Sequence, residues 1–339
     1  MSGAPGHDPG QGLPAGLSWE EYVAFLVTRE GSLAAVAERL AALRGYADDA
    51  TSVERALRRL RTRGYRDGGT WGARALAAFG LPEAVEARAR FLGAYHSRFT
   101  DLPVMLCRDL VRLWDRPPVS DAPGARTWLA LAHATVALRS VDLDGGATHL
   151  ARAHASLRGA PAEARAELLL AEAFVASRRA PVRVAGLLDE VGAVLSEPMP
   201  AAEHACLSAR WVDQRAYALN RGGARPPDPA AAEALYRTLP AEGAPPFALC
   251  RRANGLAYAR WKQGHPEEAA ALAREACRHA GDGGHLRLRA MALSMLSRVA
   301  PGEEGKEAAA RALAIAASLE DEQLRARFDP EARRARRRS

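Results

Sequence analysis

The sequence predicts an all-α protein made of two parts, a basic N-terminal head and a C-terminal α-solenoid of about five helix pairs. Apolar residues recur at i, i+3 and i+4 spacing through most of the 339 residues. Ser, Asp and Pro stand where helices would begin, and Gly and Pro stand where they would end. An alanine also recurs at intervals of 38, 46, 38 and 39 residues, which is the period of two-helix repeats. These alanines are Ala147, Ala185, Ala231, Ala269 and Ala308.

The head, residues 18–118, is expected to contain short amphipathic helices. Ser18 and Ser32 are candidate N-caps of the first two helices, because a serine hydroxyl can accept a bond from a free amide of the first turn. A seven-residue turn at 44–50 follows. Further elements are expected in chain order: a helix opened by Thr51 or Ser52 and ended by Gly64, a tight loop or hairpin at 65–72, and helices near 72–79, 82–97 and 102–114.

From residue 124 onward the pattern predicts helix pairs rich in small residues. One pair cannot bury its own apolar stripe, but a stack of neighbouring pairs can. The pairs are expected at 124–140 with 144–157, 161–178 with 181–195, 200–220 with 228–239, 245–262 with 266–280, and 285–298 with 303–318. Pro117 and Pro118 break the preceding helix, so 119–123 is expected to be a linker. Residues 1–17 are expected to be a disordered arm, 124–320 the repeat domain, and 321–339 a basic tail.

Composition favours a cytoplasmic, soluble, globular protein. Apolar residues make up 48% of the chain and charged residues 26%. The four cysteines form no CxxC pair, which argues against a disulfide scaffold and against a metal site. The first residues lack the pattern of a signal peptide, and no stretch is long enough to span a membrane. We therefore expect no cofactor, no metal ion and no membrane partner.

The basic residues are biased in kind and in place. Of the 47, only Lys262 and Lys306 are lysine. Residues 51–74 hold seven arginines against two acids, a net charge of +5, and residues 325–339 do the same. Because the whole chain carries +7, the rest of it is net −3. Two basic segments on a slightly acidic body permit an anionic partner at either one.

Helix, turn, then a helix with arginines on one face is how a helix-turn-helix domain presents its recognition helix to DNA. An arginine fork can bond guanine O6 and N7, and elsewhere it holds phosphates. The hydroxyls and free amides at the start of the third helix could clamp a phosphate. The candidate nucleic-acid-binding residues are Thr51, Ser52, Arg55, Arg58, Arg59, Arg61, Arg63 and Arg66. The alternative is an ordinary solvated helix face, and the turn at 44–50 is longer than the usual three or four residues.

Residues 256–269, LAYARWKQGHPEEA, resemble a tetratricopeptide repeat. Leu256 and Ala257 take the apolar and small positions of the first helix, and Gly264 matches the glycine of the turn between helices. Ala269 and Ala276 match the small residues at which neighbouring helices approach closely. The other units keep the small residues but lose the glycine and most of the aromatic positions. The resemblance covers roughly 124–320, and a generic helical bundle is the alternative.

Head and repeats together are similar to bacterial regulators that join an N-terminal helix-turn-helix to a C-terminal tetratricopeptide sensor region. The resemblance implies double-stranded DNA as one partner, a protein or peptide ligand on the solenoid, and a possible homodimer. Arginines and aromatics on the first helices suit an acidic or extended peptide. The candidates are Arg126, Trp128, Arg210, Arg215, Arg251, Arg252 and Arg260. The main alternative is an adaptor of the same architecture that binds other proteins and no DNA.

Residues 91–103, FLGAYHSRFTDLP, hold His96, Arg98 and Asp101 beside aromatic residues. They are either a small polar site or a structural turn in which His96 caps a helix C-terminus and Arg98 pairs with Asp101. The sequence contains no GxxxxGK[ST], GxGxxG, HExxH or GxSxG motif. We therefore expect a protein that is not an enzyme.

Overall fold

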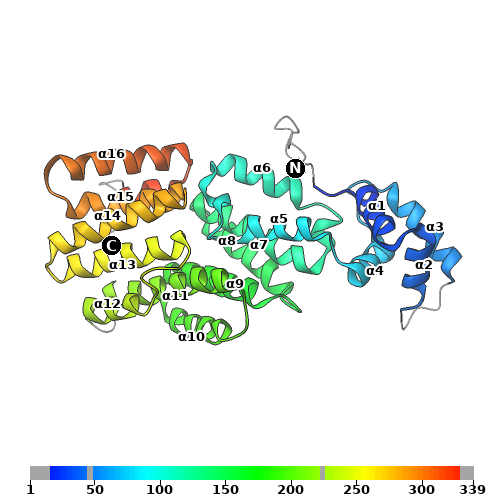
Figure 1. The fold of residues 1–339 in the computed structure, drawn as a ribbon, viewed down its shortest axis with the longest axis horizontal. Helices are drawn as coiled ribbons and strands as arrows, with labels where there is room; N and C mark the ends of the chain where they lie inside the picture. Colours follow the sequence, from blue (N-terminus) through cyan, green and yellow to red (C-terminus); the bar gives the residue numbers. More distant parts are fainter. Residues whose placement is uncertain (1–15, 44–48, 222–225, 329–339) are drawn as a thin grey trace, which may run out of the picture. The chain divides into compact units, whose positions relative to one another are not determined.

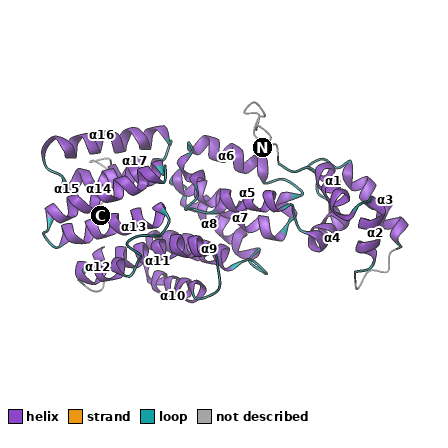
Figure 2. Cartoon of the chain, viewed as in Figure 1, coloured by secondary structure: helices purple, strands orange, loops and turns teal. Residues whose placement is uncertain are grey.

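The structure is a computed structural model that describes residues 16–43, 49–221 and 226–328. Within these ranges all regular structure is helical, with the α-helices α1 to α17, three short 3-10 helices and no strand (Figures 1 and 2). The all-α prediction is confirmed. None of the helices in the described ranges combines the length and the apolar character needed to cross a bilayer.

The chain divides by packing into two compact units. The first comprises the residues up to Ala89 together with Leu110–Arg126, and the second comprises Arg90–Asp109 together with the residues from Thr127 onward. Each unit is therefore built from two separate stretches of sequence. This differs from the single boundary expected at 119–123, because residues 90–109 pack with helices that come more than 100 residues later in the chain.

The first unit contains four helices of the predicted head. They are α1 (Trp19–Glu30), α2 (Leu33–Ala41), α3 (Ala50–Arg61) and α4 (Gly69–Phe79). Ser18 and Ser32 cap α1 and α2 as expected, each accepting a bond from a first-turn amide. Residues 44–48 of the expected turn lie outside the described residues. The helix α3 packs against α1, α2 and α4, so the second helix of the candidate helix-turn-helix is held from three sides.

Two local expectations for this unit were wrong in their boundaries. The third helix opens at Ala50, not at Thr51 or Ser52, because Asp49 is its N-cap. Aspartate is as good a cap as serine, and its carboxylate also complements the helix dipole. Of the tight loop or hairpin expected at 65–72, the structure has the loop, but the loop ends before Gly69, where α4 begins.

The core of the first unit is organised around Trp19, whose side chain is completely buried. Its indole N–H donates to the Arg66 carbonyl at 2.8 Å. Gly68 and Gly72 face the ring so closely that a Cβ atom at either position would lie 2.2 Å and 2.6 Å from it, respectively. The indole thus takes the space that side chains at the start of α4 would fill.

We expect Gly72→Ala to destabilise the protein by about 1–3 kcal/mol, because a methyl group cannot enter this packed site without moving the ring of Trp19. Urea denaturation followed by circular dichroism measures the change. The matched control is Gly186→Ala in α10 (Val184–Leu195), where an added Cβ meets no atom within 4 Å. The control should be neutral or slightly stabilising. Equal effects of the two substitutions would contradict this account of the core.

The second unit contains successive helix pairs, which match the expected ranges to within a few residues. They are α7 (Pro123–Arg139) with α8 (Leu143–Ala155), α9 (Ala162–Arg179) with α10, α11 (Ala201–Arg221) with α12 (Pro229–Arg237), α13 (Pro246–Lys262) with α14 (Pro266–Asp282), and α15 (Leu286–Val299) with α16 (Gly302–Ser318). From α9 onward, the first helix of each pair packs against its own second helix and against the first helix of the next pair. The first helices therefore form one layer, and the second helices form another.

Small residues line the contact between α13 and α14, and one glycine forms the turn that joins them. Ala269, Ala273 and Ala276 of α14 are completely buried, which lets α13 and α14 approach closely. The turn between these two helices contains Gly264 with φ of +85°, a conformation that disfavours any residue with a Cβ. The sequence positions that resemble a repeat thus have a packing reason of their own.

The expected basic tail at 321–339 was wrong in its first part. Residues Glu322–Phe328 form the helix α17, which packs on α15 and α16. Leu324 and Phe328 are buried in the apolar core shared by α13 to α16. Residues 329–339 and residues 1–15 of the arm expected at 1–17 lie outside the described residues.

The helices expected at 82–97 and 102–114 correspond to α5 (Glu83–Gly93) and α6 (Val104–Trp114), and the expected connection at 98–101 was too short. The helix α5 stops at Gly93, and the chain continues through Ala94–Pro103 with only a short 3-10 turn at Arg98–Asp101. We call Ala94–Pro103 the inserted segment. It belongs to the second unit.

Candidate functional site

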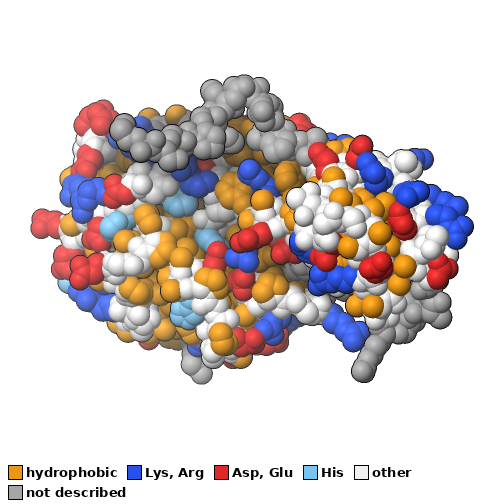
Figure 3. Space-filling model, turned by 45° about the vertical axis from the view of Figure 1, so that its right-hand side comes forward, with side chains coloured by type: hydrophobic (Ala, Val, Ile, Leu, Met, Phe, Trp, Pro, Cys, Tyr) orange, Lys and Arg blue, Asp and Glu red, His pale blue; other side chains and the backbone are white. Residues whose placement is uncertain are grey.

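The helix α3 has one apolar face and one basic face. Val53, Leu57 and Leu60 are buried at i, i+4 and i+7 spacing, so they hold the helix against the rest of the first unit. The arginines between them point the other way. The candidates Arg55, Arg58, Arg59, Arg61, Arg63 and Arg66 are all exposed. Figure 3 shows basic side chains, with acidic ones between them, at the surface of this unit.

These arginines are only lightly neutralised. Arg58 pairs with Glu54 one turn earlier, at 2.6 Å. Arg55 donates weakly to the Ser52 hydroxyl at 3.3 Å, while Arg63 and Arg66 donate to backbone carbonyls. In the described part of the chain, no carboxylate pairs with Arg59 or Arg61. The basic face therefore presents exposed guanidinium groups to a partner.

The start of α3 differs from the expected phosphate clamp. The Ser52 backbone N–H donates to Asp49 Oδ1 at 2.9 Å, and the Ser52 hydroxyl donates to Oδ2 at 2.8 Å. These bonds from Ser52 hold the pKa of Asp49 below its usual value. Thr51 is exposed. A phosphate at this helix end would have to displace the Asp49 carboxylate, which sequence reasoning missed although an Asp-Asp pair precedes the helix.

The candidate partner-binding residues, from Arg126 to Arg260, fall into three separate groups. The first group does not converge on a site. Arg126 donates to the Ser120 and Asp121 carbonyls, both at 3.0 Å, and Trp128 is buried. Arg215 lies over the Trp211 ring and is 3.4 Å from an oxygen of Asp189.

Arg252 and Arg260 form the second group, at a groove of about 340 Å³ lined by residues of α12, α13 and α14. Arg260 is 3.3 Å from carboxylate oxygens of both Glu233 and Glu268. Arg252 donates to the Leu239 carbonyl at 3.1 Å. Internal partners already engage both guanidinium groups.

Arg210 and Arg251 form the third group, and they meet at Tyr95 of the inserted segment. Arg287, which was not among the candidates, joins them. The three guanidinium carbons lie 4.4, 5.6 and 5.1 Å from the Tyr95 ring centre, respectively. They come from three successive first helices, α11, α13 and α15, and all three side chains are buried. Cation–π contacts in such desolvated surroundings are stronger than at an exposed surface.

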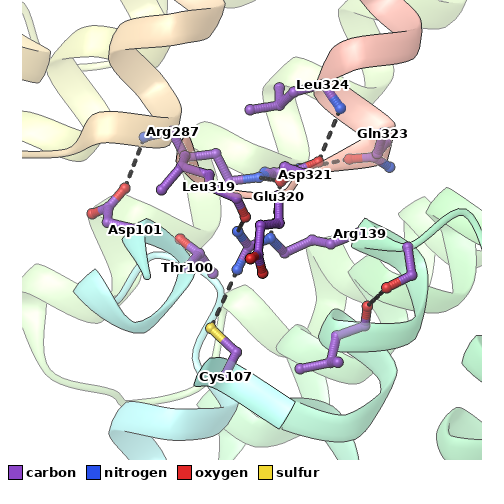
Figure 4. A network of polar contacts seen from close by, with 12 residues as sticks. Thr100, Asp101, Cys107, Arg139, Arg287, Leu319, Glu320, Asp321, Gln323 and Leu324 are labelled. Atoms are coloured by element: carbon purple, nitrogen blue, oxygen red, sulfur yellow. Dashed lines mark hydrogen bonds and ion pairs between the residues drawn. The ribbon is translucent and has the colours of Figure 1, made fainter. Parts of the chain in front are cut away.

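Each buried arginine of this cluster has an acidic partner. Arg210 pairs with Glu167, and Arg251 pairs with Asp213. Arg287 and Arg139 both donate to the same oxygen of Asp321, each at 2.9 Å, and Asp321 is completely buried (Figure 4). Four buried arginines thus share three carboxylates, which offset most of the positive charge inside the fold.

The arginines shift the ionisation of their neighbours. Burial raises the pKa of Tyr95, but the positive charges around it, led by Arg287 and Arg251, outweigh burial and bring the pKa down to about 8. For Asp321 burial also opposes ionisation, and the charges of Arg287 and Arg139 again prevail, so that its pKa lies below the usual value. Both groups are stabilised as anions.

The inserted segment is fixed at two further points. Asp101 accepts the Arg287 backbone N–H at 2.8 Å at the start of α15, and its other oxygen is 3.4 Å from Arg98 Nε. His96 Nε2 lies 2.6 Å from a carboxylate oxygen of Glu203 on α11. The pairing of Arg98 with Asp101 is confirmed. The interpretation of His96 as a helix cap was wrong, since α5 ends three residues earlier and the imidazole reaches α11 instead.

Sequence reasoning missed this assembly because its members lie far apart in the chain. Arg210, Arg251 and Arg287 lie on successive first helices but at different places along them, so no repeated sequence position marks the cluster. No protein-family model matches the chain, and comparison with curated proteins and with solved structures gives no match.

Proposed function

We propose that the protein is a DNA-binding regulator, with α3 as its recognition helix and the helix pairs of the second unit as a tetratricopeptide-like solenoid that receives a protein or peptide signal. The observation that carries the proposal is the basic face of α3. It is exposed along its length, and its apolar face is committed to the core of the first unit. A helix anchored in this way can lie in a major groove without rearranging.

The charge on this face fits a phosphate backbone. No carboxylate in the described ranges pairs with Arg59 or Arg61, so nothing nearby offsets their attraction for a phosphate. Releasing the counterions of DNA is the main source of affinity for such a face. The turn that follows, with Arg63 and Arg66, lies beyond the C-terminus of α3 and extends the same positive surface.

The packing of the second unit supports the solenoid part of the proposal. Each first helix from α9 onward contacts the next first helix, an arrangement in which every pair depends on its neighbours. Stacked first helices form a continuous surface, and this is the kind of surface on which an extended peptide binds.

One observation favours an adaptor that binds no DNA. The Asp49 carboxylate occupies the first amides of α3, so this end of the helix would repel a phosphate. In an adaptor the arginines of α3 would bind an acidic protein surface. Both functions use the same face, and duplex DNA discriminates between them.

The test is a gel-shift titration of the full chain with random duplex DNA at several salt concentrations. The full chain is needed because the second unit holds residues 90–109. We expect binding at low salt with a linear fall of log affinity against log salt. The variant Arg55→Gln, Arg59→Gln, Arg61→Gln should reduce that slope by about 2.7, since each lost phosphate contact removes about 0.9.

A control variant removes the same charge outside both basic segments: Arg158→Gln, Arg278→Gln, Arg311→Gln, all exposed and in the second unit. Its slope should stay that of the wild type. Absence of any shift at low salt would favour the adaptor. Equal slopes for the two variants would place the DNA contact somewhere other than α3 and overturn the proposal.

A further inference from the structure

The inserted segment lies on the layer of first helices in the manner of a bound peptide. It has no helix of its own beyond a short 3-10 turn. Tyr95 meets α11, α13 and α15 through Arg210, Arg251 and Arg287, and its hydroxyl accepts bonds from the last two of these arginines. One short stretch of the chain thus contacts three successive first helices.

Two anchors carry this recognition, an aromatic side chain and a carboxylate six residues later. The first anchor is the Tyr95 ring, which packs among three guanidinium groups and beside Phe247 of α13. The second is Asp101, which receives the Arg287 backbone N–H at the positive end of α15. Between them His96 reaches Glu203 of α11 and packs against Phe247. A peptide-binding groove gains specificity when separate pockets receive side chains that are spaced along the peptide.

Some polar atoms where the inserted segment contacts the first helices lack a hydrogen-bond partner among the described residues. Arg251 Nε is buried and has no hydrogen-bond partner among the described residues. His96 Nδ1 and Glu167 Oε2 are also buried and lie 4.0 Å apart, too far for a hydrogen bond. A buried polar atom without a partner opposes the closed state. Arg251 Nε also borders a small enclosed cavity that Asp213 and Asn254 help to line, and Asn254 Oδ1 is unpartnered there too. The contact is therefore rich in charge but not optimised as a permanent core.

We propose that the inserted segment is an internal ligand. It occupies a peptide-binding groove on α11, α13 and α15, and an external peptide with the same two anchors, a tyrosine and an aspartate six residues apart, displaces it. This inference does not depend on DNA binding by α3. Because the segment is tethered at both ends, its effective concentration at the groove is of the order of millimolar, and it competes strongly with any external peptide.

The test is a binding titration with a fluorescent peptide of the sequence GAYHSRFTDLP, which copies residues 93–103. The full chain is compared with a released variant, Tyr95→Ala with Asp101→Ala, read by fluorescence anisotropy. The released variant should bind the peptide at least about tenfold more tightly than the wild type, because the tethered competitor has lost its anchors. A peptide with alanine in place of its tyrosine and aspartate should bind neither protein.

The control variant is Tyr217→Ala with Asp282→Ala, which removes an exposed tyrosine and an exposed aspartate outside the groove. It should bind the peptide as the wild type does. If the released variant keeps its helical circular dichroism and binds no more tightly than the wild type, the proposal is overturned.

If the released variant does not fold, hydrogen exchange of the wild-type chain decides the question. An internal ligand should open locally, so that its amides exchange much faster than those of α11, α13 and α15. Saturating peptide should increase the exchange of residues 94–103 further. If these amides exchange only with global unfolding, with or without peptide, the segment is a permanent part of the core and the proposal fails.

Discussion

Replacing Asp321 with asparagine is expected to destabilise the protein by about 3–5 kcal/mol, the usual effect of breaking a buried ion pair from one side. Asp321 has no exposed surface and holds both Arg139 and Arg287, whose guanidinium groups are themselves buried. Asparagine keeps the shape and can still accept the Leu324 amide bond that starts α17. It leaves two buried cations without their shared anion. For a unit of this size the melting temperature should fall by roughly 10 °C.

The matched control is Glu303→Gln, which also replaces an acid with its amide. Glu303 and its partner Lys306 are about three-quarters exposed, so their attraction is screened by water. The control should change stability by less than about 0.5 kcal/mol. Thermal and urea denaturation of both variants measure the difference. If the Asp321 and Glu303 variants have the same melting temperature, the buried network does not stabilise the second unit.

The second large effect concerns pH and Tyr95. The pKa of this tyrosine is about 8 in the folded protein, against an ordinary value of 10.0. Between these two values the folded chain has released the phenol proton while the unfolded chain still holds it, so stability rises with pH. Two pKa units correspond to roughly 3 kcal/mol. This contribution is complete above pH 10 and is lost as the pH falls through about 8.

Urea denaturation at about pH 7.5 and about pH 9.5 tests this prediction. The free energy of unfolding of the wild type should increase between the two relative to that of Tyr95→Phe. The comparison with Tyr95→Phe is needed because burial raises the pKa of the four cysteines, which lowers stability in both chains as the pH rises through 9. Absorbance of the phenolate gives a second readout, since one tyrosine should ionise near pH 8 in the wild type only. Tyr217→Phe, at an exposed tyrosine, should leave both measurements unchanged. A wild-type chain without a tyrosine that ionises below pH 9 would refute the assignment.

Local sequence signals were sufficient for most of the helices. The serine caps of α1 and α2 and the glycine at 264 fix where helices begin or end, because each satisfies a backbone need within a few residues. The first miss was also local: Asp49 precedes α3 and caps it, although the serine and threonine after it looked equally suitable. A second was α17, where Leu324 and Phe328 are spaced by one helical turn but stand among arginines.

The buried cluster could not be found by such means. Tyr95 and Arg287 are 192 residues apart, and the sequence around either residue gives no sign of the contact. Arg210 and Arg251 were predicted to bind a peptide, and the structure buries both, which is unusual for arginine. Arg210 and Arg251 are buried because Glu167 and Asp213 neutralise them inside the fold. Each ion pair joins two successive first helices, α9 to α11 and α11 to α13, so the sequence of one helix pair does not contain both partners.

The distance along the chain between Tyr95 and its arginines has a consequence for synthesis. A ribosome adds about 5–20 residues per second, so Tyr95 is made roughly 10–40 s before Arg287. During that interval the stretch at 94–103 has left the exit tunnel without the helix that receives its aspartate. Nascent chains therefore pass through a stage in which this stretch is accessible to chaperones. The second unit closes only after Asp321 has been made, because that residue joins Arg139 to Arg287.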